Sequence, residues 1–266
     1  MKNNKHIFNT KSLLFIMIAM VLLCVSCVDE NFNPNIDATE DVIIANEIET
    51  NIKATGVVYK EVEAISEKMK LGQAIGVLIN QERNEWEYTF DTDLLSGKIV
   101  VAYSEQNPDS EVRTVDCSKL KIHYYENIWI LLFGTIALEN IKTLQESKKY
   151  NIQTTKFGYA DIKKSKTSNI AENSDYFVDY NFPQENVSAK LAFSGSSNGQ
   201  NQSSGAYKQK IIKDIVIDLH TLKIIDGKMN IIIDRYGENF PIEVEYSKSG
   251  RTVKYRGNEQ TTSYDN

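Results

Sequence analysis

The sequence predicts an all-β fold, mostly an antiparallel meander that forms a sandwich or a curved half-barrel, with an N-terminal helical segment. Apolar residues recur every three or four positions between Thr39 and Leu71, and from about Trp86 they alternate with polar residues. Turn signals rich in Gly and Asn separate the alternating runs. No strand–helix–strand spacing follows Gly72, which argues against a parallel sheet.

The first 26 residues have the pattern of an export signal. Met1–Lys11 carries lysines and no acid, and Ser12–Val25 is apolar but shorter than the roughly 20 residues of a spanning helix. Ser26 then precedes Cys27 and a polar segment. This order resembles a bacterial lipoprotein signal, in which the cysteine becomes the lipidated N-terminus. The resemblance implies a signal peptide over 1–26 and fatty chains such as palmitate on Cys27, with plain secretion and an uncleaved anchor as alternatives.

Residues 27–38 are expected to be a flexible tether. The segment is rich in asparagine and has no apolar periodicity. Its Val28-Asp29-Glu30 resembles the acidic run of surface-exported lipoproteins in the Bacteroides–Flavobacterium group. That resemblance implies a lipid-anchored protein of the outer membrane that is exposed at the cell surface, and the alternative is a protein that faces the periplasm.

The composition is that of a folded, weakly acidic chain. With 41% hydrophobic and 25% charged residues, it can form a packed core. A net charge of -6 argues against nucleic acid as a partner, because nucleic-acid binding needs a basic surface. Once Cys24 leaves with the signal and Cys27 is acylated, Cys117 has no partner for a disulfide, and we expect it to be a small buried side chain in a strand.

Residues 39–72 are predicted to be helical. Thr39 can cap the helix, and an apolar stripe that includes Ile44, Ile48 and Ile52 lies on one face. Charged residues occupy the other faces, and Gly56 either breaks the segment into two helices or lies within one. We expect the stripe to pack on the protein's own sheet, and a coiled coil with a partner is the alternative.

The β domain is predicted to span 86–256, with a polar tail at 257–266. Alternation over Leu120–Tyr124, Val187–Phe193, Ile215–Leu219 and Ile242–Tyr246 predicts strands buried on one face. The predicted turns are Ser96-Gly97, Asn107-Pro108-Asp109, Asp226-Gly227, Tyr236-Gly237-Glu238-Asn239 and Ser249-Gly250, and Asp226-Gly227 is the strongest hairpin signal. The polar segment Ser194–Ala206 is either a flexible loop or the polar ends of two long strands.

Two stretches resemble uncharacterised β-rich lipoproteins of the Bacteroides–Flavobacterium group. The first, SGKIVVAYSEQNPDSEVRTVDCSKLKIHYYENIWILLFGTIALENI, contains the G-K-I strand as Gly97-Lys98-Ile99 and an aromatic, Asn-containing turn as Tyr124-Tyr125-Glu126-Asn127. The second, DGKMNIIIDRYGENFPIEVEYSKSGRTVKY, has Arg235-Tyr236-Gly237 where that family has a Tyr-Gly turn. The resemblance implies location and fold and carries no activity.

The sequence contains no catalytic motif, Gly-rich phosphate loop or calcium loop, so we expect no enzyme activity and no cofactor. His123 and His220 fall on the polar faces of separate predicted strands and do not have metal-ligand spacing, so no metal is expected. Acids at Glu85, Glu87, Asp91 and Asp93 are interpreted as a charged rim, although a glycosidase carboxylate pair is an alternative.

Aromatic residues give the remaining functional signal. Tyr124, Tyr125 and Trp129 cluster near one turn, and exposed aromatic rings can stack on sugars, although packing inside the fold is the default. We therefore expect a non-catalytic, membrane-anchored lipoprotein of the cell envelope with a structural or binding role. A glycan- or polymer-binding module is the first alternative, and its partner would be a glycan or another envelope protein. A glycoside hydrolase and a carrier of a lipid-like ligand are further alternatives.

Overall fold

The computed structural model describes residues 34–73, 76–104, 112–125, 128–161, 166–167, 171–183, 188–201, 205–235 and 237–264. Backbone contacts divide the chain into Met1–Thr39 and Glu40–Asn266, and the second unit holds the sheet together with most of the helix. The predicted signal peptide and Cys27 lie outside the described residues.

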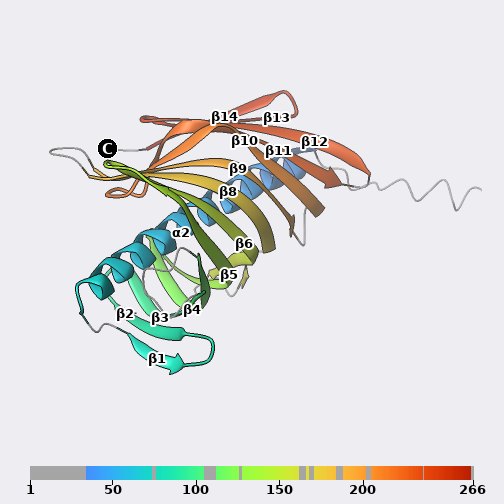
Figure 1. Cartoon of the computed structure of the whole chain (residues 1–266). Helices are drawn as coiled ribbons and strands as arrows, with labels where there is room; N and C mark the ends of the chain where they lie inside the picture. Colours follow the sequence, from blue (N-terminus) through green and yellow to red (C-terminus); the bar gives the residue numbers. More distant parts are fainter. Residues whose placement is uncertain are drawn as a thin grey trace, which may run out of the picture. The chain divides into compact units, whose positions relative to one another are not determined.

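A single antiparallel sheet forms most of Glu40–Asn266 (Figure 1). Within the described residues, neighbouring strands follow the chain order from β1 to β14, except that β7 pairs with β6 beside this path. The sheet does not close on itself, so the predicted antiparallel meander is confirmed as an open, curved sheet. The elements are α2 (Pro34–Lys70), β1 (Val77–Asn80), β2 (Glu85–Asp91), β3 (Leu95–Tyr103), β4 (Val112–Tyr125), β5 (Ile128–Thr143), β6 (Ser147–Asp161), β7 (Lys166–Thr167), β8 (Ala171–Asn181), β9 (Lys190–Asn201), β10 (Gly205–Asp218), β11 (Ile224–Arg235), β12 (Glu238–Ser247), β13 (Gly250–Tyr255) and β14 (Asn258–Ser263).

The sheet packs around the part of α2 from Glu40 onward, which forms the centre of the hydrophobic core (Figure 1). The predicted stripe is fully buried at Ile44, Ile48 and Ile52, which confirms that the helix packs on the protein's own sheet. Burial also extends beyond the stripe, because every residue from Ile48 to Tyr59 except Lys53 is buried. A helix that is buried on most sides must satisfy its polar side chains inside the protein.

Gly56 lies within one continuous helix, so the alternative of two helices is wrong. A Cβ atom at this position would lie 3.2 Å from Leu191 Cδ1 on β9. The glycine therefore lets α2 approach the sheet closely, a packing reason that outweighs its low helix propensity. The helix also starts at Pro34, inside the predicted tether, where proline suits a first helical position because its missing N–H needs no intrahelical partner.

Alternation identified the strands well. Leu191 and Phe193 on β9, Ile215 and Ile217 on β10, and Val244 on β12 all point into the core, as their spacing predicts. Cys117 is likewise buried and free on β4, and burial raises the pKa of its thiol. Within the polar segment, Ser194–Asn201 forms the end of β9 and Gly205–Ala206 the start of β10, so the described residues agree with the alternative of two long strands.

Two glycine signals predicted turns where the structure has continuous strands. Asp226-Gly227 lies inside β11, and the chain reverses instead over residues 219–223. Ser96-Gly97 lies inside β3. Both glycines have positive φ, 133° at Gly227 and 106° at Gly97, and both strands carry register shifts against their neighbours. Gly in this conformation serves a β-bulge as well as a turn, which is why the prediction failed.

The bounds of the β domain are wider than predicted. β1 and the start of β2 precede Trp86, and β14 pairs with β13 where the sequence predicted a polar tail. β14 reads NEQTTS, and all six of its residues are exposed. An edge strand that buries neither face has no apolar alternation, so its sequence cannot be distinguished from a tail.

Candidate functional site

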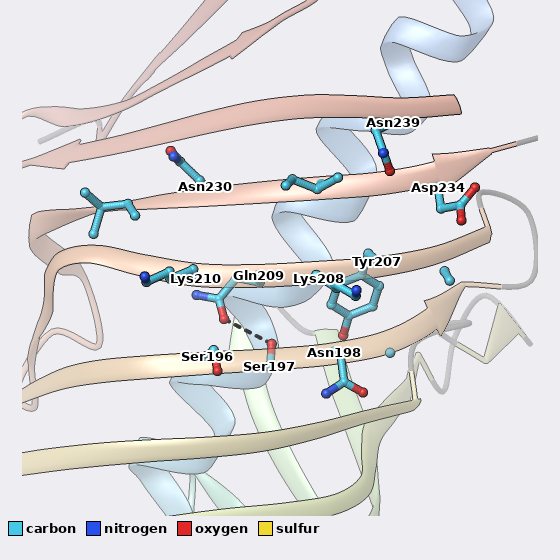
Figure 2. Close-up of a pocket in the computed structure, with 14 residues that line it drawn as sticks. Ser196, Ser197, Asn198, Tyr207, Lys208, Gln209, Lys210, Asn230, Asp234 and Asn239 are labelled. Atoms are coloured by element: carbon cyan, nitrogen blue, oxygen red, sulfur yellow. Dashed lines mark hydrogen bonds between the residues drawn. The ribbon is translucent and has the colours of Figure 1, made fainter. Parts of the chain in front are cut away.

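A groove lies on the outer face of β9–β12, the face turned away from α2 (Figure 2). Its volume is about 750 Å³. We call it the outer groove, and it is lined by Ser196, Ser197, Asn198, Gly199, Ala206, Tyr207, Lys208, Gln209, Lys210, Ile212, Asn230, Ile232, Asp234 and Asn239.

Strand alternation and short side chains together create the outer groove. On β10, Tyr207, Gln209 and Ile211 are buried, so the residues between them point outward. The outward positions beside them on β9 and at the start of β10 are small, as at Ser196 and Ala206. Short side chains between longer neighbours leave a depression in this face of the sheet.

Strand register places the polar groups of the groove in rows across the sheet. Asn198 pairs with Lys208, which pairs with Ile232. A second row joins Lys210 to Asn230 in the same way. Each row therefore contains an amide group and a lysine ammonium, and the first row adds the apolar surface of Ile232. Figure 2 shows Asn198, Lys208, Lys210 and Asn230 on one face of the strands.

The donor set of the outer groove suits a ligand rich in hydroxyl groups. The carboxamides of Asn198, Asn230 and Asn239 each offer two N–H donors and a carbonyl acceptor. Lysine ammonium groups add donors, and Asp234 adds an acceptor. Hydroxyl groups both donate and accept, so this mixture can satisfy them in several orientations.

Apolar surface lies within and beside the groove. Ile212 and Ile232 are 51% and 45% exposed. Phe177, on β8, is also 51% exposed and pairs with Ser194, two residues before groove residue Ser196. Its exposed ring lies on the outer face because its neighbours Tyr176 and Val178 are buried. Exposed aromatic and aliphatic groups of this kind can pack on the apolar faces of a sugar ring.

A buried polar cluster supports the groove from the core side. Ser197 donates to Gln209 Oε1 over 3.1 Å, and Tyr207 donates to Glu172 Oε2 over 3.1 Å. Glu172 is fully buried. Burial raises the pKa of its carboxyl to about 7, although hydrogen bonding by Tyr207 and Asn51 acts in the opposite direction. The cluster joins β8, β9 and β10 to α2 beneath the groove.

Buried ion pairs fix the strands around α2. Asp41 pairs with Arg235 at the end of β11 over 2.9 Å and with Arg256 over 3.0 Å. Farther along the helix, Glu49 pairs with Arg251 on β13 over 2.7 Å and with Lys53 over 2.6 Å. Burial alone would raise the pKa of Glu49, but the charges of Lys53 and Arg251 hold it below its usual value.

The other end of the helix repeats this arrangement. Glu63 pairs with Arg113 on β4 over 2.6 Å and with Lys148 on β6 over 2.8 Å. Arg113 also donates to Ser66 Oγ over 2.8 Å. Burial would raise the pKa of Glu63, but Arg113 and Lys148 hold it below its usual value. Asp41, Glu49 and Glu63 on α2 therefore each form ion pairs with basic residues that lie far away in the sequence.

The residues predicted as ligand contacts lie away from the outer groove. Tyr124 and Tyr125 end β4, and Trp129 lies near the start of β5, where it pairs with His123 across the two strands. The side chains of the two tyrosines lie outside the described residues. Trp129 is half-buried and stacks on His123, with ring centroids 4.9 Å apart and an interplanar angle of 13°. This stack makes Trp129 part of a cross-strand aromatic pair.

Other candidate groups are distributed over the surface. Glu87 pairs with Lys98 over 2.6 Å, Asp91 is exposed, and His220 is exposed in a turn. Among the described residues, no group of three or more His, Cys, Asp or Glu is arranged to hold a metal ion. No helix in the described part of the chain is long and apolar enough to cross a bilayer.

Sequence reasoning missed the residues of the outer groove. The signal was present as outward positions in alternating strands, such as Lys208 and Lys210 between buried Tyr207, Gln209 and Ile211. Their partners Asn198 and Asn230 could be found only from strand register, which a single sequence does not specify here. Comparisons with family models, curated proteins and solved structures find no match for this chain.

Proposed function

We propose that the protein is a lipid-anchored lipoprotein of the cell envelope that acts as a non-catalytic binding module. Its proposed ligand is a hydroxyl-rich polymer such as a glycan, which lies in the outer groove. The observation that carries this proposal is the groove itself, whose polar lining consists mainly of amide, hydroxyl and ammonium groups around exposed isoleucines. The export pattern before Cys27 supports the anchor.

The shape and chemistry of the groove favour a polymer over a small molecule. The groove follows an open sheet face and draws its lining from four strands, so an extended ligand can cross it. Asn198 and Asn230 would bind hydroxyl groups, and Ile232 would contact an apolar ring face. Phe177 lies beside the groove, where a longer polymer would reach it.

The carboxylate content of the groove favours binding over hydrolysis. Sugar hydrolysis generally uses two carboxyl groups on either side of the scissile bond. Among the described residues that line the outer groove, Asp234 is the only carboxylate. We therefore assign Asp234 a role in hydrogen bonding to the ligand.

The Tyr124–Trp129 turn is a second candidate for the ligand-binding surface. The observation in its favour is the half-buried Trp129 ring, which a sugar could contact at its remaining exposed edge. Its stack on His123 already uses one ring face, so we rank this turn below the outer groove.

A glycan array with the purified protein tests the proposed ligand class. We expect binding to at least one class of polysaccharide, and we expect the Asn198→Ala/Asn230→Ala variant to weaken it by about tenfold or more, because each lost hydrogen bond contributes about 1 kcal/mol. Gln153→Ala, an exposed change on β6 outside the groove, is the matched control and should bind as wild type does. Equal binding by the groove variant and wild type would contradict the assignment.

Fractionation of cells tests the anchor. Cys27→Ala should move the protein from membranes to the soluble fraction and abolish the uptake of labelled palmitate, because the acyl chains provide the membrane affinity. If the variant stays in the membrane fraction and takes up as much label as wild type, Cys27 is not the lipidated residue.

A further inference from the structure

The sheet leaves one strip of α2 incompletely covered. Asn46, Lys53, Lys60 and Glu67 are exposed or half-buried along a helix that is otherwise mostly buried. They are seven residues apart, which places them on the same side of the helix, about two turns from one another. This strip marks an opening in the wrapped sheet, which we call the seam.

An apolar hollow lies at the seam between α2 and the sheet. Its volume is about 340 Å³. Apolar side chains from the helix, β4, β5 and the turn before β11 line it: Ala54, Val57, Ile122, Ile130 and Leu222. Its polar lining comes from Lys53, Thr221, Lys223 and Tyr264. The hollow therefore combines an apolar wall with two lysine side chains.

A second hollow continues along the same side of the helix. Its volume is about 460 Å³, and it is lined by Lys60, Leu94, Ser188, Ala189, Leu219, His220, Thr221 and Leu222. Thr221 and Leu222 belong to both hollows, so the turn between β10 and β11 separates them. Asp218 fixes this turn by accepting hydrogen bonds from the backbone N–H groups of His220 and Thr221, over 2.9 and 3.0 Å.

We propose that the apolar hollow at the seam binds the acyl chain of a fatty acid, with its carboxylate held by Lys223. The apolar wall would take the chain, and the exposed lysine places a positive charge where a carboxylate could remain near water. This site is separate from the outer groove, which lies on the opposite face of the sheet and has a polar lining.

The charge distribution at the hollow supports an anionic ligand. The Lys223 ammonium lies 5.8 Å from the centre of the Tyr264 ring and is exposed, so it can also bind a carboxylate. Lys53 is already paired with Glu49 over 2.6 Å, so it adds less net attraction. No acidic side chain is among the described residues that line the hollow.

The size of the hollow favours one acyl chain. Ligand sites generally have volumes of about 300–1,000 Å³, and this hollow is at the lower end of that range. A phospholipid with two chains would need more room than the hollow provides. A single-chain fatty acid fits both the volume and the charge.

Titration of the purified, delipidated protein with a fluorescent fatty acid tests the proposal. We expect saturable binding, and we expect Lys223→Gln to weaken the affinity for the fatty acid by about fivefold, as loss of an exposed ion pair would. The same variant should bind the corresponding fatty alcohol as wild type does, because the alcohol has no carboxylate. Lys213→Gln removes an exposed lysine from β10 and should leave both affinities unchanged.

A second variant tests whether the chain enters the hollow. Ala54→Phe places a ring in the space that the chain would fill, and it should reduce the affinity for both the acid and the alcohol by more than about tenfold. Circular dichroism and the thermal midpoint establish that this variant is folded. The proposal is overturned if wild type shows no saturable binding, or if folded Ala54→Phe and Lys223→Gln both bind the fatty acid as tightly as wild type does.

Discussion

Glu172 is a fully buried carboxyl group beneath the outer groove, and its surroundings favour the protonated form. Burial raises its pKa from an ordinary 4.5 to about 7. The folded protein therefore keeps this proton at pH values at which the unfolded chain has released it. Stability from this group is present below pH 4.5 and declines as the pH rises toward 7, by about 3 kcal/mol in total.

Replacement of Glu172 by glutamine should remove this pH dependence. Gln has nearly the same shape and stays neutral, so Glu172→Gln should be more stable than wild type above pH 7, with a difference of up to about 3 kcal/mol. Urea unfolding at several pH values between 5 and 8 measures the effect. An unchanged difference in stability across that range would show that Glu172 does not titrate there.

The Glu63–Arg113 ion pair has the opposite effect on pH dependence. The pKa of Glu63 is held below its usual value, so the pair stabilises the fold above pH 4.5, and that stability is lost as the pH falls through the lower folded-state pKa. Arg113→Met would leave the buried carboxylate with Lys148 as its remaining partner among the pairs described above.

We expect Arg113→Met to reduce the free energy of unfolding at pH 7 by about 3 kcal/mol, because the loss of one partner leaves a buried charge poorly compensated. The matched control is Lys149→Ala, which breaks an exposed pair with Asp179 and should change stability by less than about 1 kcal/mol. Urea unfolding measures both. Similar small losses for the two variants would mean that the buried pair does not hold β4 on the helix.

At the scale of secondary structure, glycine bulges set the path of the strands. Gly97 has a φ of 106°, and a Cβ atom there would lie 2.1 Å from the Lys119 carbonyl oxygen on β4. The neighbouring backbone leaves no room for a side chain, so a substitution must shift β3 against β4.

Gly97→Ala should therefore destabilise the fold by more than about 2 kcal/mol, from both the steric contact and the unfavourable φ. Gly257 separates these two causes, because its φ is 77° but a Cβ atom there would meet no described atom within 4 Å beyond its chain neighbours. Gly257→Ala should cost only about 1 kcal/mol, from φ alone. Thermal unfolding of both variants measures the difference, and equal costs would contradict a steric role for the bulge.

Local patterns predicted which segments are strands but not every place where the chain turns. Alternation at Ile242–Tyr246 depends only on which face is buried, so one sequence is sufficient to predict it. The meaning of Gly227 depends on the strand beside it, where a Cβ would lie 2.7 Å from Ile215 Cα. Helical periodicity alone assigns Glu49 and Glu63 to the polar faces of the helix. Their burial in ion pairs could not be predicted, because their arginine partners are far away in the sequence.

At the scale of the whole sheet, the two proposed sites depend on its two faces. The inner face encloses α2 but leaves it incompletely covered at the seam, where the apolar hollow lies. The outer face carries the outer groove. The strand order follows the chain, so the sequence predicted the meander, but neither site could be predicted from it. The outer groove needs the register of β9 against β10 and β11, and the hollow at the seam needs residues as distant as Ala54 and Tyr264.

The most direct test of the proposed function is hydroxyl-radical footprinting of the side chains with and without the strongest-binding glycan from the array. We expect the ligand to reduce oxidation of Ile212 and Ile232, whose exposed side chains line the outer groove, while oxidation of Trp129 stays unchanged. Protection of Trp129 with no change at the two isoleucines would contradict the assignment of the outer groove and move the ligand to the turn between β4 and β5.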